Sequence, residues 1–481
     1  MKITFTFLVI LFLIVNSNSQ FQPDVRLTNN SAASVTSFNN AWCVAANGSV
    51  VHVVWSDGRD ANFEIYYKRS TDSGITWGAD TRLTNTSGVS EWPSIAVSGL
   101  NVHVVWHDRI TSGGTYYKRS TDGGVSWGPD LLLRSNTVTL GSISLALSGS
   151  SVHVVWHENI GANYEIYYKR STDGGTNWGT DTRLTVDSAT SGYPCITASG
   201  SVVHVVWHDG RQGSSNFEIY YIRSTDGGTT WGAETRLTNN PAVSGYPCIT
   251  SSGQAVHVVW NDVRDGNNEI YYKYSSDGGV SWGADTRLTN NSAVSQNASL
   301  SLSGSNLHLV WIDNRDGNYE VYYKRSTDGG VSWETDTRLT NDVAFSTYAS
   351  VSASGPVVHV VWQDLRDFAN GEIYYKQNPT GNPIGIININ SELPQSFSLS
   401  QNYPNPFNPK TVISFQLAVN SFASLKVYDL LGREVATLVN EQLQPGTYEV
   451  DWDGSGFASG VYYYKLSAGD YTETRKMVLI K

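Results

Sequence analysis

The amino-acid sequence predicts an all-β protein: a seven-bladed β-propeller of four-stranded blades, followed by a small β-sandwich. Three observations predict this fold. A unit of roughly 50 residues repeats along most of the chain, a period typical of propeller blades. Each unit holds four short segments of β-branched and aromatic residues, bounded by Gly, Asn, Asp or Ser. The 481 residues include 44 Gly, 27 Tyr and 16 Trp but only 2 Met, which favours strands and tight turns over helices.

The first segment of the chain, residues 1–20, has the pattern of a secretory signal peptide. Lys2 precedes an apolar run from Phe5 to Val15, and small polar residues follow it. A membrane anchor is the alternative, but the run is shorter than the ~20 residues that a spanning helix needs, and no later segment is long enough. The net charge of −11 and the absence of Lys/Arg blocks argue against nucleic acid. We therefore expect an exported chain with no nucleic-acid partner and no transmembrane segment after signal cleavage.

Each repeat is predicted to form four antiparallel strands, which we call A, B, C and D in chain order. Strand A consists of small residues, as in SIAVSG at 94–99, and strand B reads VHVVW or a close variant, in seven copies. Strand C reads EIYYKRS and strand D reads DTRLT, again with variants. A sheet of four such strands, buried on both faces against its neighbours, is a propeller blade.

The two ends of the repeat region predict how the ring closes. The chain after the signal peptide begins with an isolated D strand at 24–28, and the last repeat stops after its C strand at 372–376. Joining the two completes a seventh blade and leaves no open sheet edge, which would otherwise invite aggregation. The propeller is therefore predicted to span residues 21–377.

A Ser-x-Asp-x-Gly-x-x-Trp motif lies between strands C and D in six repeats. In such a hairpin the Ser and Asp side chains hydrogen-bond turn amides, Gly supplies the permissive backbone, and Trp packs beneath the turn. Six equivalent copies cannot all line one catalytic centre, so we interpret the motif as structural. Its aspartates are Asp72, Asp122, Asp173, Asp226, Asp277 and Asp328.

Copies such as STDSGITW (70–77) and STDGGVSW (120–127) resemble the Asp-box, or bacterial neuraminidase repeat, of the sialidase superfamily. The resemblance covers residues 24–376. It implies a sialidase-like propeller whose Asp boxes lie between the third and fourth strands, away from the catalytic face. Because successive strands alternate in direction, the B–C and D–A loops emerge together on that other face, which we call the mouth.

The B–C loops carry a repeated Asp-x-Arg pattern on the mouth. Since a guanidinium group can bind a carboxylate in bidentate fashion, these arginines are candidate ligand-binding residues. The alternative is that each arginine pairs with carboxylates of its own or the next hairpin and belongs to the scaffold. Structural calcium is a weaker alternative, because the carboxylate spacing does not match an EF-hand loop. The candidates are Arg59, Arg211, Arg264, Arg315 and Arg366.

Aromatic residues end the D–A loops on the same face, at equivalent positions of four repeats. Such rings can stack on sugars, or they can pack over the top of the blade. Trp42 lies one residue out of register with them. The four candidates are Trp92, Tyr193, Tyr246 and Tyr348.

The histidines and cysteines suggest no metal or cofactor. His107, His157 and His208 follow the B-strand Trp in three consecutive blades, and we interpret them as surface or turn residues, with metal ligation as the alternative. The other seven histidines lie inside VHVVW strands and are predicted to pack. Three cysteines, Cys43, Cys195 and Cys248, share one strand-A position with serines of other repeats, so small buried residues are expected.

The sequence assigns no catalytic residue. The sialidase resemblance implies an arginine triad for the substrate carboxylate, a Tyr nucleophile assisted by Glu, an Asp acid/base and an early Arg-Ile-Pro segment. The chain instead begins with VRLTNN and has no Arg-Ile-Pro. A glycosidase needs a unique pair of carboxyl groups, and only Glu91 and Glu158 stand apart from the repeat on this face.

The C-terminal segment no longer follows the repeat. A Pro/Gly/Asn-rich linker is predicted at 378–394. From 395 to 481, four motifs follow in order: YPNPFNPKT, VYDLLGREVATLV, GTYEVDWDGSGFASGVYYYKL and TRKMVLIK. They closely resemble the type A C-terminal sorting domain of the bacterial type IX secretion system, and also the immunoglobulin-like domain of flagellar hook-capping proteins. The resemblance implies an immunoglobulin-like sandwich that engages the type IX machinery, and a secreted or cell-surface location on a bacterium.

Together these features favour an exported sialidase-like propeller that binds a glycan or a protein ligand on its mouth without chemistry and without a cofactor. One alternative is an exo-α-sialidase or related glycoside hydrolase with a diverged site. A second is a purely structural surface protein.

Overall fold

The structure is a computed structural model, and it describes residues 21–37, 42–109, 113–135, 140–161, 163–213, 216–367, 370–379, 386–390, 394–443, 445–454 and 457–480. The predicted signal peptide lies outside the described residues. All described secondary structure is β, as expected from the sequence. The chain divides into two compact units, one of which comprises Gln22–Gly381 and the other of which includes Asn382–Lys481. The described part of the chain has no helix with the length and apolarity of a membrane span.

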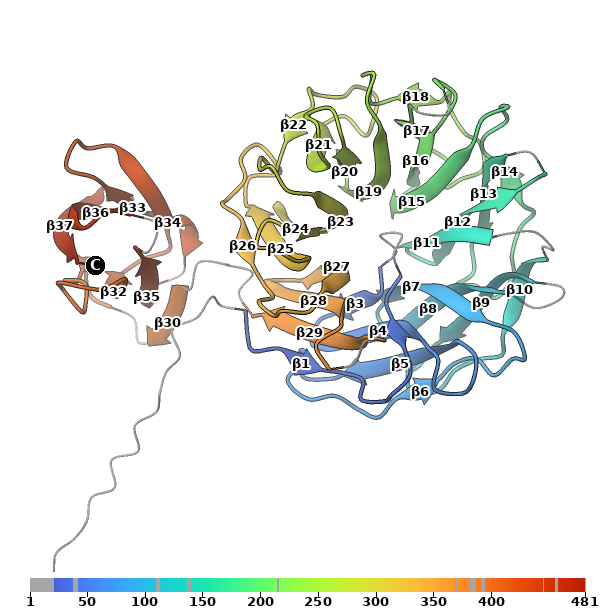
Figure 1. Cartoon of the computed structure of the whole chain (residues 1–481), viewed down its shortest axis with the longest axis horizontal. Coiled ribbons are helices and arrows are strands. Elements are labelled where there is room, and N and C mark those ends of the chain that lie inside the picture. Colours follow the sequence, from blue (N-terminus) through green and yellow to red (C-terminus); the bar gives the residue numbers. More distant parts are fainter. Residues whose placement is uncertain are drawn as a thin grey trace, which may run out of the picture. The chain divides into compact units, whose positions relative to one another are not determined.

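The first unit is a ring of seven sheets around a central hub (Figure 1). The A strands line the hub: β2 (Ser34–Val35) with β3 (Val44–Asn47), β7 (Ser90–Ser98), β11 (Leu140–Ser148), β15 (Ser191–Ser199), β19 (Ser244–Ser252), β23 (Ser295–Ser303) and β27 (Ser346–Ser354). The B strands come next: β4 (Val50–Asp57), β8 (Asn101–Asp108), β12 (Ser151–Asn159), β16 (Val202–Asp209), β20 (Ala255–Asp262), β24 (Asn306–Asp313) and β28 (Val357–Asp364).

The C and D strands form the outer half of each blade. The C strands are β5 (Glu64–Ser70), β9 (Gly114–Ser120), β13 (Tyr164–Ser171), β17 (Glu218–Ser224), β21 (Glu269–Ser275), β25 (Glu320–Ser326) and β29 (Glu372–Asn378). The D strands are β6 (Thr81–Arg82), β10 (Leu131–Ser135), β14 (Thr182–Arg183), β18 (Thr235–Arg236), β22 (Thr286–Arg287), β26 (Thr337–Arg338) and β1 (Val25–Arg26). Most D strands are therefore shorter than the DTRLT pattern predicts. We number the blades 1 to 7 from β4 to β28.

The predicted closure of the ring is confirmed. β1 pairs antiparallel with β29, with Val25 opposite Tyr375 and Arg26 opposite Tyr374. The first strand of the unit thus becomes the fourth strand of blade 7. Because β1 supplies that outer strand, blade 7 is a complete four-stranded sheet like that of blade 6.

The B strands are buried on both faces because each blade is covered by a blade on either side. In β4 every residue from Val51 to Asp57 is buried. The seven histidines inside these strands are buried, as predicted, and each also meets a C-strand tyrosine: His52 Nδ1 lies 2.7 Å from Tyr67 Oη. These residues form the apolar and hydrogen-bonded interior of the ring.

The Asp boxes connect neighbouring blades. Asp122 accepts hydrogen bonds from the Ser120 hydroxyl at 2.7 Å and the Ser126 amide at 2.9 Å, within its own hairpin. Trp127 packs edge-on against Tyr67 of the preceding blade, with ring centroids 4.9 Å apart. A Cβ on Gly124 would lie 1.9 Å from Tyr67 Oη, so this close approach requires glycine. The same arrangement recurs round the ring.

The A strands of neighbouring blades are linked through side chains, since they do not pair with one another. Ser144 Oγ accepts a hydrogen bond from the Ile196 amide of the next blade at 3.3 Å, and Ser299 accepts one from Val351 in the same way. Cys43, Cys195 and Cys248 are buried, which confirms the sequence expectation for this strand position.

The second unit consists of two four-stranded sheets. One holds β30 (Ile386–Asn390), β35 (Gly446–Asp453), β32 (Lys410–Leu417) and β31 (Ser398–Leu399). The other holds β34 (Glu434–Leu443), β33 (Ser421–Tyr428), β36 (Gly460–Ala468) and β37 (Tyr471–Leu479). Residues of both sheets, such as Phe415 and Leu425, share one apolar core. The segment predicted as a linker contains β30, so it is not wholly irregular.

Candidate functional site

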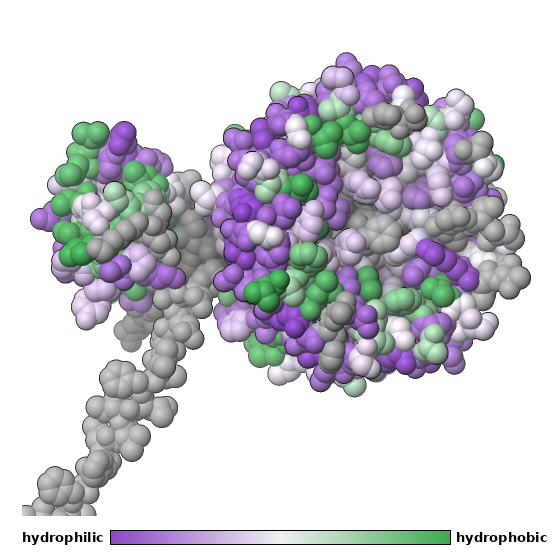
Figure 2. Space-filling view, in the orientation of Figure 1, coloured by the Kyte–Doolittle hydropathy of each residue, from purple (hydrophilic) through white to green (hydrophobic). Residues whose placement is uncertain are grey.

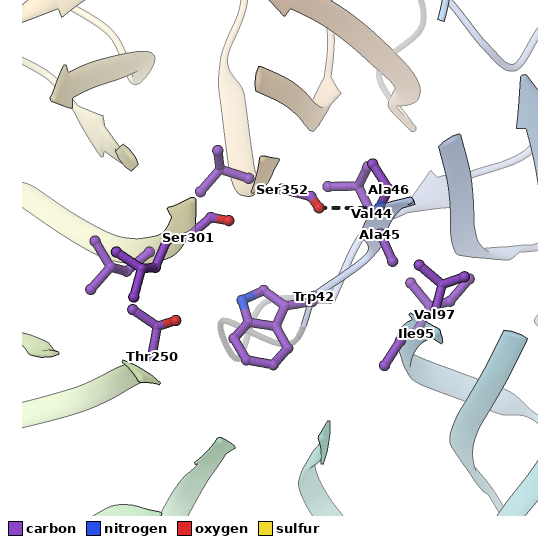
Figure 3. Close-up of a pocket in the computed structure, with 13 residues that line it drawn as sticks. Trp42, Val44, Ala45, Ala46, Ile95, Val97, Thr250, Ser301 and Ser352 are labelled. Carbon is purple, nitrogen blue, oxygen red and sulfur yellow. Dashed lines mark hydrogen bonds between the residues drawn. The ribbon is translucent and has the colours of Figure 1, made fainter. Parts of the chain in front are cut away.

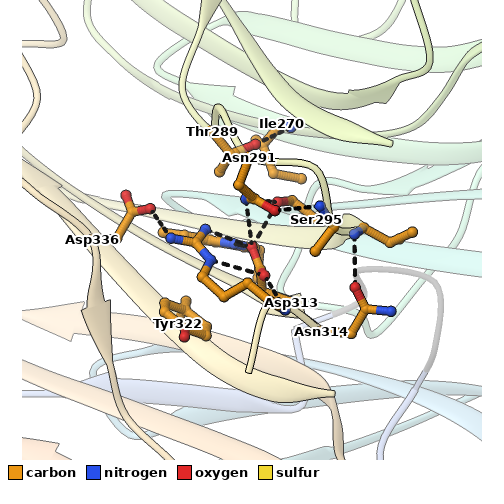
Figure 4. A network of polar contacts seen from close by, with 12 residues as sticks. Ile270, Thr289, Asn291, Ser295, Asp313, Asn314, Tyr322 and Asp336 are labelled. Carbon is orange, nitrogen blue, oxygen red and sulfur yellow. Dashed lines mark hydrogen bonds and ion pairs between the residues drawn. The ribbon is translucent and has the colours of Figure 1, made fainter. Parts of the chain in front are cut away.

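The predicted ligand-binding arginines each sit in a repeated ion-pair arrangement, which we call the arginine clamp. Figure 4 shows the clamp of blade 6. Asp313, at the end of strand B, accepts hydrogen bonds from the Arg315 amide and Nε, both at 2.9 Å. Arg315 Nη1 reaches Asp336, which precedes strand D, at 2.7 Å. The guanidinium lies 4.5 Å from the centre of the Tyr322 ring of strand C.

The other four candidates are held in the same way. Each pairs with two carboxylates: Arg59 with Asp57 and Asp80, Arg211 with Asp209 and Glu234, Arg264 with Asp262 and Asp285, and Arg366 with Asp364 and Asp24. Burial alone would raise the pKa of Asp57, but hydrogen bonds from Arg59 and Trp55 hold that pKa below its usual value. The clamps therefore neutralise these arginines within the scaffold and leave little of their charge for a ligand.

Two further arginines, which the sequence reasoning missed, also form ion pairs on the propeller. Arg134 of β10 fills the clamp position of blade 3, where it pairs with Glu158 at 3.0 Å and Asp181 at 2.9 Å. Arg109, on the mouth side of blade 2, pairs with Glu91 at 3.0 Å, and its guanidinium lies 4.5 Å from the centre of the Trp92 ring. The sequence carried two signals for these exceptions. In LLLRS the Arg lies later than in the DTRLT pattern of other D strands, and in HDR no Gly separates the Asp from the Arg.

The predicted mouth aromatics share an unusual backbone conformation. Trp92, Tyr193, Tyr246 and Tyr348 have φ between 51° and 57°, at a β-bulge in strand A. Blade 6 has Asn297 in the same conformation, at φ 57°. A bulky residue in the left-handed region costs on the order of 1–2 kcal/mol, which glycine would avoid and asparagine would reduce. Four of the five positions nevertheless carry a large aromatic side chain.

Tyr193 and Tyr246 form the centre of a cluster in blades 3 to 5. Their ring centroids lie 4.6 Å apart, and Tyr193 also contacts His157 at 5.5 Å and His208 at 4.8 Å. Both tyrosines are half-buried, so part of each ring remains open to solvent. The Tyr193 amide donates a hydrogen bond of 3.0 Å to His157 Nδ1, which fixes the strained residue from the neighbouring blade.

The interpretation of His107, His157 and His208 as surface or turn residues is wrong. All three lie in B strands and are buried, because each ring packs between strand A of its own blade and strand A of the next. A Cβ on Gly141 would lie 1.5 Å from His157 Nε2. Burial lowers the pKa of His157 to about 3 and that of His208 to about 4, so both rings are neutral. Among the described residues, no group of three or more His, Cys, Asp or Glu is arranged to hold a metal ion.

A cavity of about 190 Å³ lies in the hub (Figure 3). The Trp42 indole points into it, and the other lining residues come from A strands, including Ile95, Thr250, Ser301 and Ser352. All of the lining residues are apolar or hydroxyl-bearing. The cavity therefore has the volume to hold a small group, and the described residues that line it include no acid or base.

The two acids that stand apart from the repeat are both held in ion pairs, Glu91 with Arg109 and Glu158 with Arg134. Burial raises the pKa of Glu91. Neither of the two acids is therefore a free carboxylate in the part of the chain that the structure describes. The surface in the view of Figure 2 is mostly hydrophilic, with apolar residues in small separate areas.

Comparisons with known proteins agree with this architecture. A sialidase of Paraclostridium sordellii is 25% identical over 237 residues, which cover 42% of this chain and 57% of that protein. The chain thus spans little more than half the length of this relative. An ulvan lyase solved with bound -[GlcA(1-4)Rha3S]- matches with a TM-score of 0.54 at 12% identity, over 73% of this chain and 95% of that one. The polysaccharide lyase Uly1 matches with a TM-score of 0.52 at 11% identity, over 74% and 98%.

Two family profiles match the chain. The secretion system C-terminal sorting domain covers residues 401–481, which indicates a secreted or cell-surface protein that engages the type IX secretion machinery. The BNR repeat-like domain matches residues 14–258 and 161–360, most of the chain. With its sialidase-type propeller, this protein therefore belongs to the BNR repeat-like domain family.

Proposed function

We propose that the propeller is a carbohydrate-binding module, exported by the type IX system, that holds a glycan on the aromatic residues of its mouth and performs no chemistry. The observation that carries the proposal is the strained conformation of Trp92, Tyr193, Tyr246 and Tyr348. Strained residues cluster at functional sites, where the position of the side chain offsets the cost of the backbone.

The chemistry of the cluster suits sugar binding. Half-exposed tyrosines supply a flat apolar face and a hydroxyl that donates or accepts hydrogen bonds, which matches the mixed surface of a sugar ring. The relatives named above include a sialidase and a lyase with a bound saccharide, so the fold accommodates glycans in other proteins. The candidate arginines contribute less, because the clamps neutralise their charge.

The proposal that the propeller catalyses no reaction rests on the ion pairs of its two non-repeated glutamates. A glycoside hydrolase needs two carboxyl groups flanking one bond, whereas Glu91 and Glu158 are each paired with an arginine. An exo-α-sialidase or related hydrolase remains the alternative that an activity assay addresses directly. Incubation with a fluorogenic sialoside and with uronic-acid polysaccharides should give no product above a buffer control, and turnover by the purified protein would contradict this part of the proposal.

Binding is tested with the purified chain on a glycan array, followed by calorimetry with the strongest hit. The double variant Tyr193→Ala/Tyr246→Ala should weaken binding by about thirtyfold, since truncating a central aromatic contact costs about 2 kcal/mol. Tyr403→Ala removes a tyrosine that is 81% exposed in the C-terminal unit and serves as the control. An array without hits, or equal affinities for the double variant and the wild type, would refute glycan binding at this site.

A further inference from the structure

One blade lacks the arginine that the others share. Among the described residues, six blades place a guanidinium group between two carboxylates and over a C-strand tyrosine. In five of them the arginine belongs to the Asp-x-Arg loop, and in blade 3 it is Arg134. In six blades, therefore, this position holds a guanidinium group.

Blade 2 retains the rest of the clamp. Asp108 ends its B strand, Asp130 precedes its D strand, and Tyr116 lies on its C strand, at the positions that Asp57, Asp80 and Tyr66 occupy in blade 1. The sequence after Asp108 is Arg-Ile in place of Gly-Arg. Arg109 is thus one residue too early and turns to Glu91 and Trp92.

The buried polar atoms of blade 2 lack the partners that the arginine supplies elsewhere. Asp108 is 1% exposed, and its Oδ2 accepts hydrogen bonds from Thr86 and Ser90, but its Oδ1 has no partner. In blade 1 the same oxygen, Oδ1 of Asp57, accepts the hydrogen bonds of the clamp arginine.

The missing arginine also changes the electrostatics of blade 2. Burial raises the pKa of Asp108, with further contributions from Glu64 and Asp130, whereas the pKa of Asp57 is lowered by its arginine. Asp130 pairs with Lys118 through Oδ1 at 2.8 Å, while its side chain is 34% exposed against 21% for Asp80. Blade 2 therefore has an excess of negative charge at the point where the other blades are neutralised.

Two charged residues that flank this position in blade 1 are replaced by apolar residues in blade 2. Leu132 lies opposite Tyr116 in the strand register, where blade 1 has Arg82 opposite Tyr66. Gly114 lies opposite Asp108, where blade 1 has Glu64 opposite Asp57. Leu132 is 44% exposed. An entering side chain would meet an aromatic face, a leucine and two carboxylates.

We propose that blade 2 binds an alkylguanidinium group from outside the propeller, the arginine side chain of a peptide or protein partner, between Asp108 and Asp130 and over Tyr116. The planar fork of a guanidinium matches a carboxylate in bidentate fashion, and its alkyl stem suits Leu132. A divalent cation fits less well, since hard cations take six or more oxygen ligands.

The test is calorimetric titration of the full mature chain with the peptide acetyl-Ala-Arg-Ala-amide. The peptide should bind at one site, the lysine counterpart more weakly, and the citrulline counterpart, which has the same shape without charge, at least about tenfold more weakly. No binding of the arginine peptide, equal binding of the citrulline peptide, or binding of Ca²⁺ in place of the peptide would overturn the proposal.

Three variants locate the site. Asp108→Asn should weaken binding at least about tenfold by removing the charge and keeping the shape. Ile110→Arg restores the Asp-x-Arg sequence and should abolish binding while raising the melting temperature. Arg264→Ala opens the clamp of blade 5, so the stoichiometry should rise from one to two. Unchanged affinity in both blade 2 variants, or a stoichiometry of one in folded Arg264→Ala, would contradict the assignment.

A second arm separates the sources of the guanidinium group. Free L-arginine carries an ammonium and a carboxylate that the peptide lacks. Tighter binding of the peptide supports the proposed protein partner, whereas tighter binding of the free amino acid would overturn that partner and assign the site to a small molecule.

Discussion

At the scale of single residues, the positions with positive φ separate scaffold from candidate site. Gly124 and Gly149 both have positive φ, at +81° and +58°, but only Gly124 lies against another side chain. The mouth aromatics also have positive φ, although their side chains are large. Glycine in these turns serves the fold, whereas Tyr193 and its equivalents put a ring where a ligand can reach it.

The two glycines give a matched pair of variants. Gly149→Ala places a Cβ in open space, so it should cost only the backbone strain, about 1–2 kcal/mol. Gly124→Ala adds a Cβ that would lie 1.9 Å from Tyr67 Oη, so overpacking should cost about 1–3 kcal/mol more. Chemical denaturation measures both. Equal losses of stability would show that the contact between Asp box and tyrosine is not tight.

At the scale of the strand, the sequence predicted strands A, B and C well because their residues pack in every blade. It missed Arg134 and the burial of His157, because both depend on how a neighbouring blade packs. It also overestimated strand D: Thr81–Arg82 pairs with strand C, whereas beyond it the Leu83 amide donates to the Ile65 carbonyl and Thr84 bonds strand C only through its hydroxyl. The shifted Arg in LLLRS marks a departure from the repeat, but the local sequence does not tell which blade supplies the partners of its side chain.

The B-strand histidines make a prediction about pH. Burial lowers the pKa of His103 and His204 from 6.5 to about 4, and the other buried histidines are shifted in the same direction. The unfolded chain therefore binds more protons below pH 6.5, so stability is fully present above that pH. It should fall by about 1.4 kcal/mol per pH unit for each such histidine as the pH drops towards 4.

Melting temperatures from pH 8 to pH 4.5 measure this effect. His208→Asn, which gives blade 4 the residue that blade 5 has at Asn261, should show a shallower dependence than the wild type. A melting temperature that stays constant between pH 7 and pH 5 would show that the buried rings do not titrate as described.

At the scale of the propeller, seven similar blades close into a ring, and the candidate sites are the mouth aromatics of four blades and the incomplete clamp of blade 2. The count of blades and the closure by β1 followed from the sequence, because they depend only on the order of strands. The candidate sites were harder to predict. The sequence named the mouth aromatics, but it also named five arginines whose charge the clamps neutralise, because a repeated Asp-x-Arg pattern looks the same whether its arginine is paired or free.

Removal of the closing strand tests the ring. Deletion of residues 21–28 takes away β1, exposes the edge of β29 and breaks the ion pairs of Asp24 with Arg366 at 2.7 Å and Lys376 at 2.9 Å. We expect a lower melting temperature and association through the open edge, seen by size-exclusion chromatography. A truncated chain that is as stable and as monodisperse as one beginning at residue 21 would argue against closure by this strand.

The central claim is that the protein binds a glycan through the parts of the mouth that carry strained aromatic residues. A crystal structure with the strongest glycan-array hit tests it most directly. The account predicts a sugar ring stacked on Tyr193 or Tyr246, with the clamp arginines still paired to their carboxylates. A sugar held by Arg211 or Arg264 after the clamps have opened, or one bound among the Asp boxes, would contradict it.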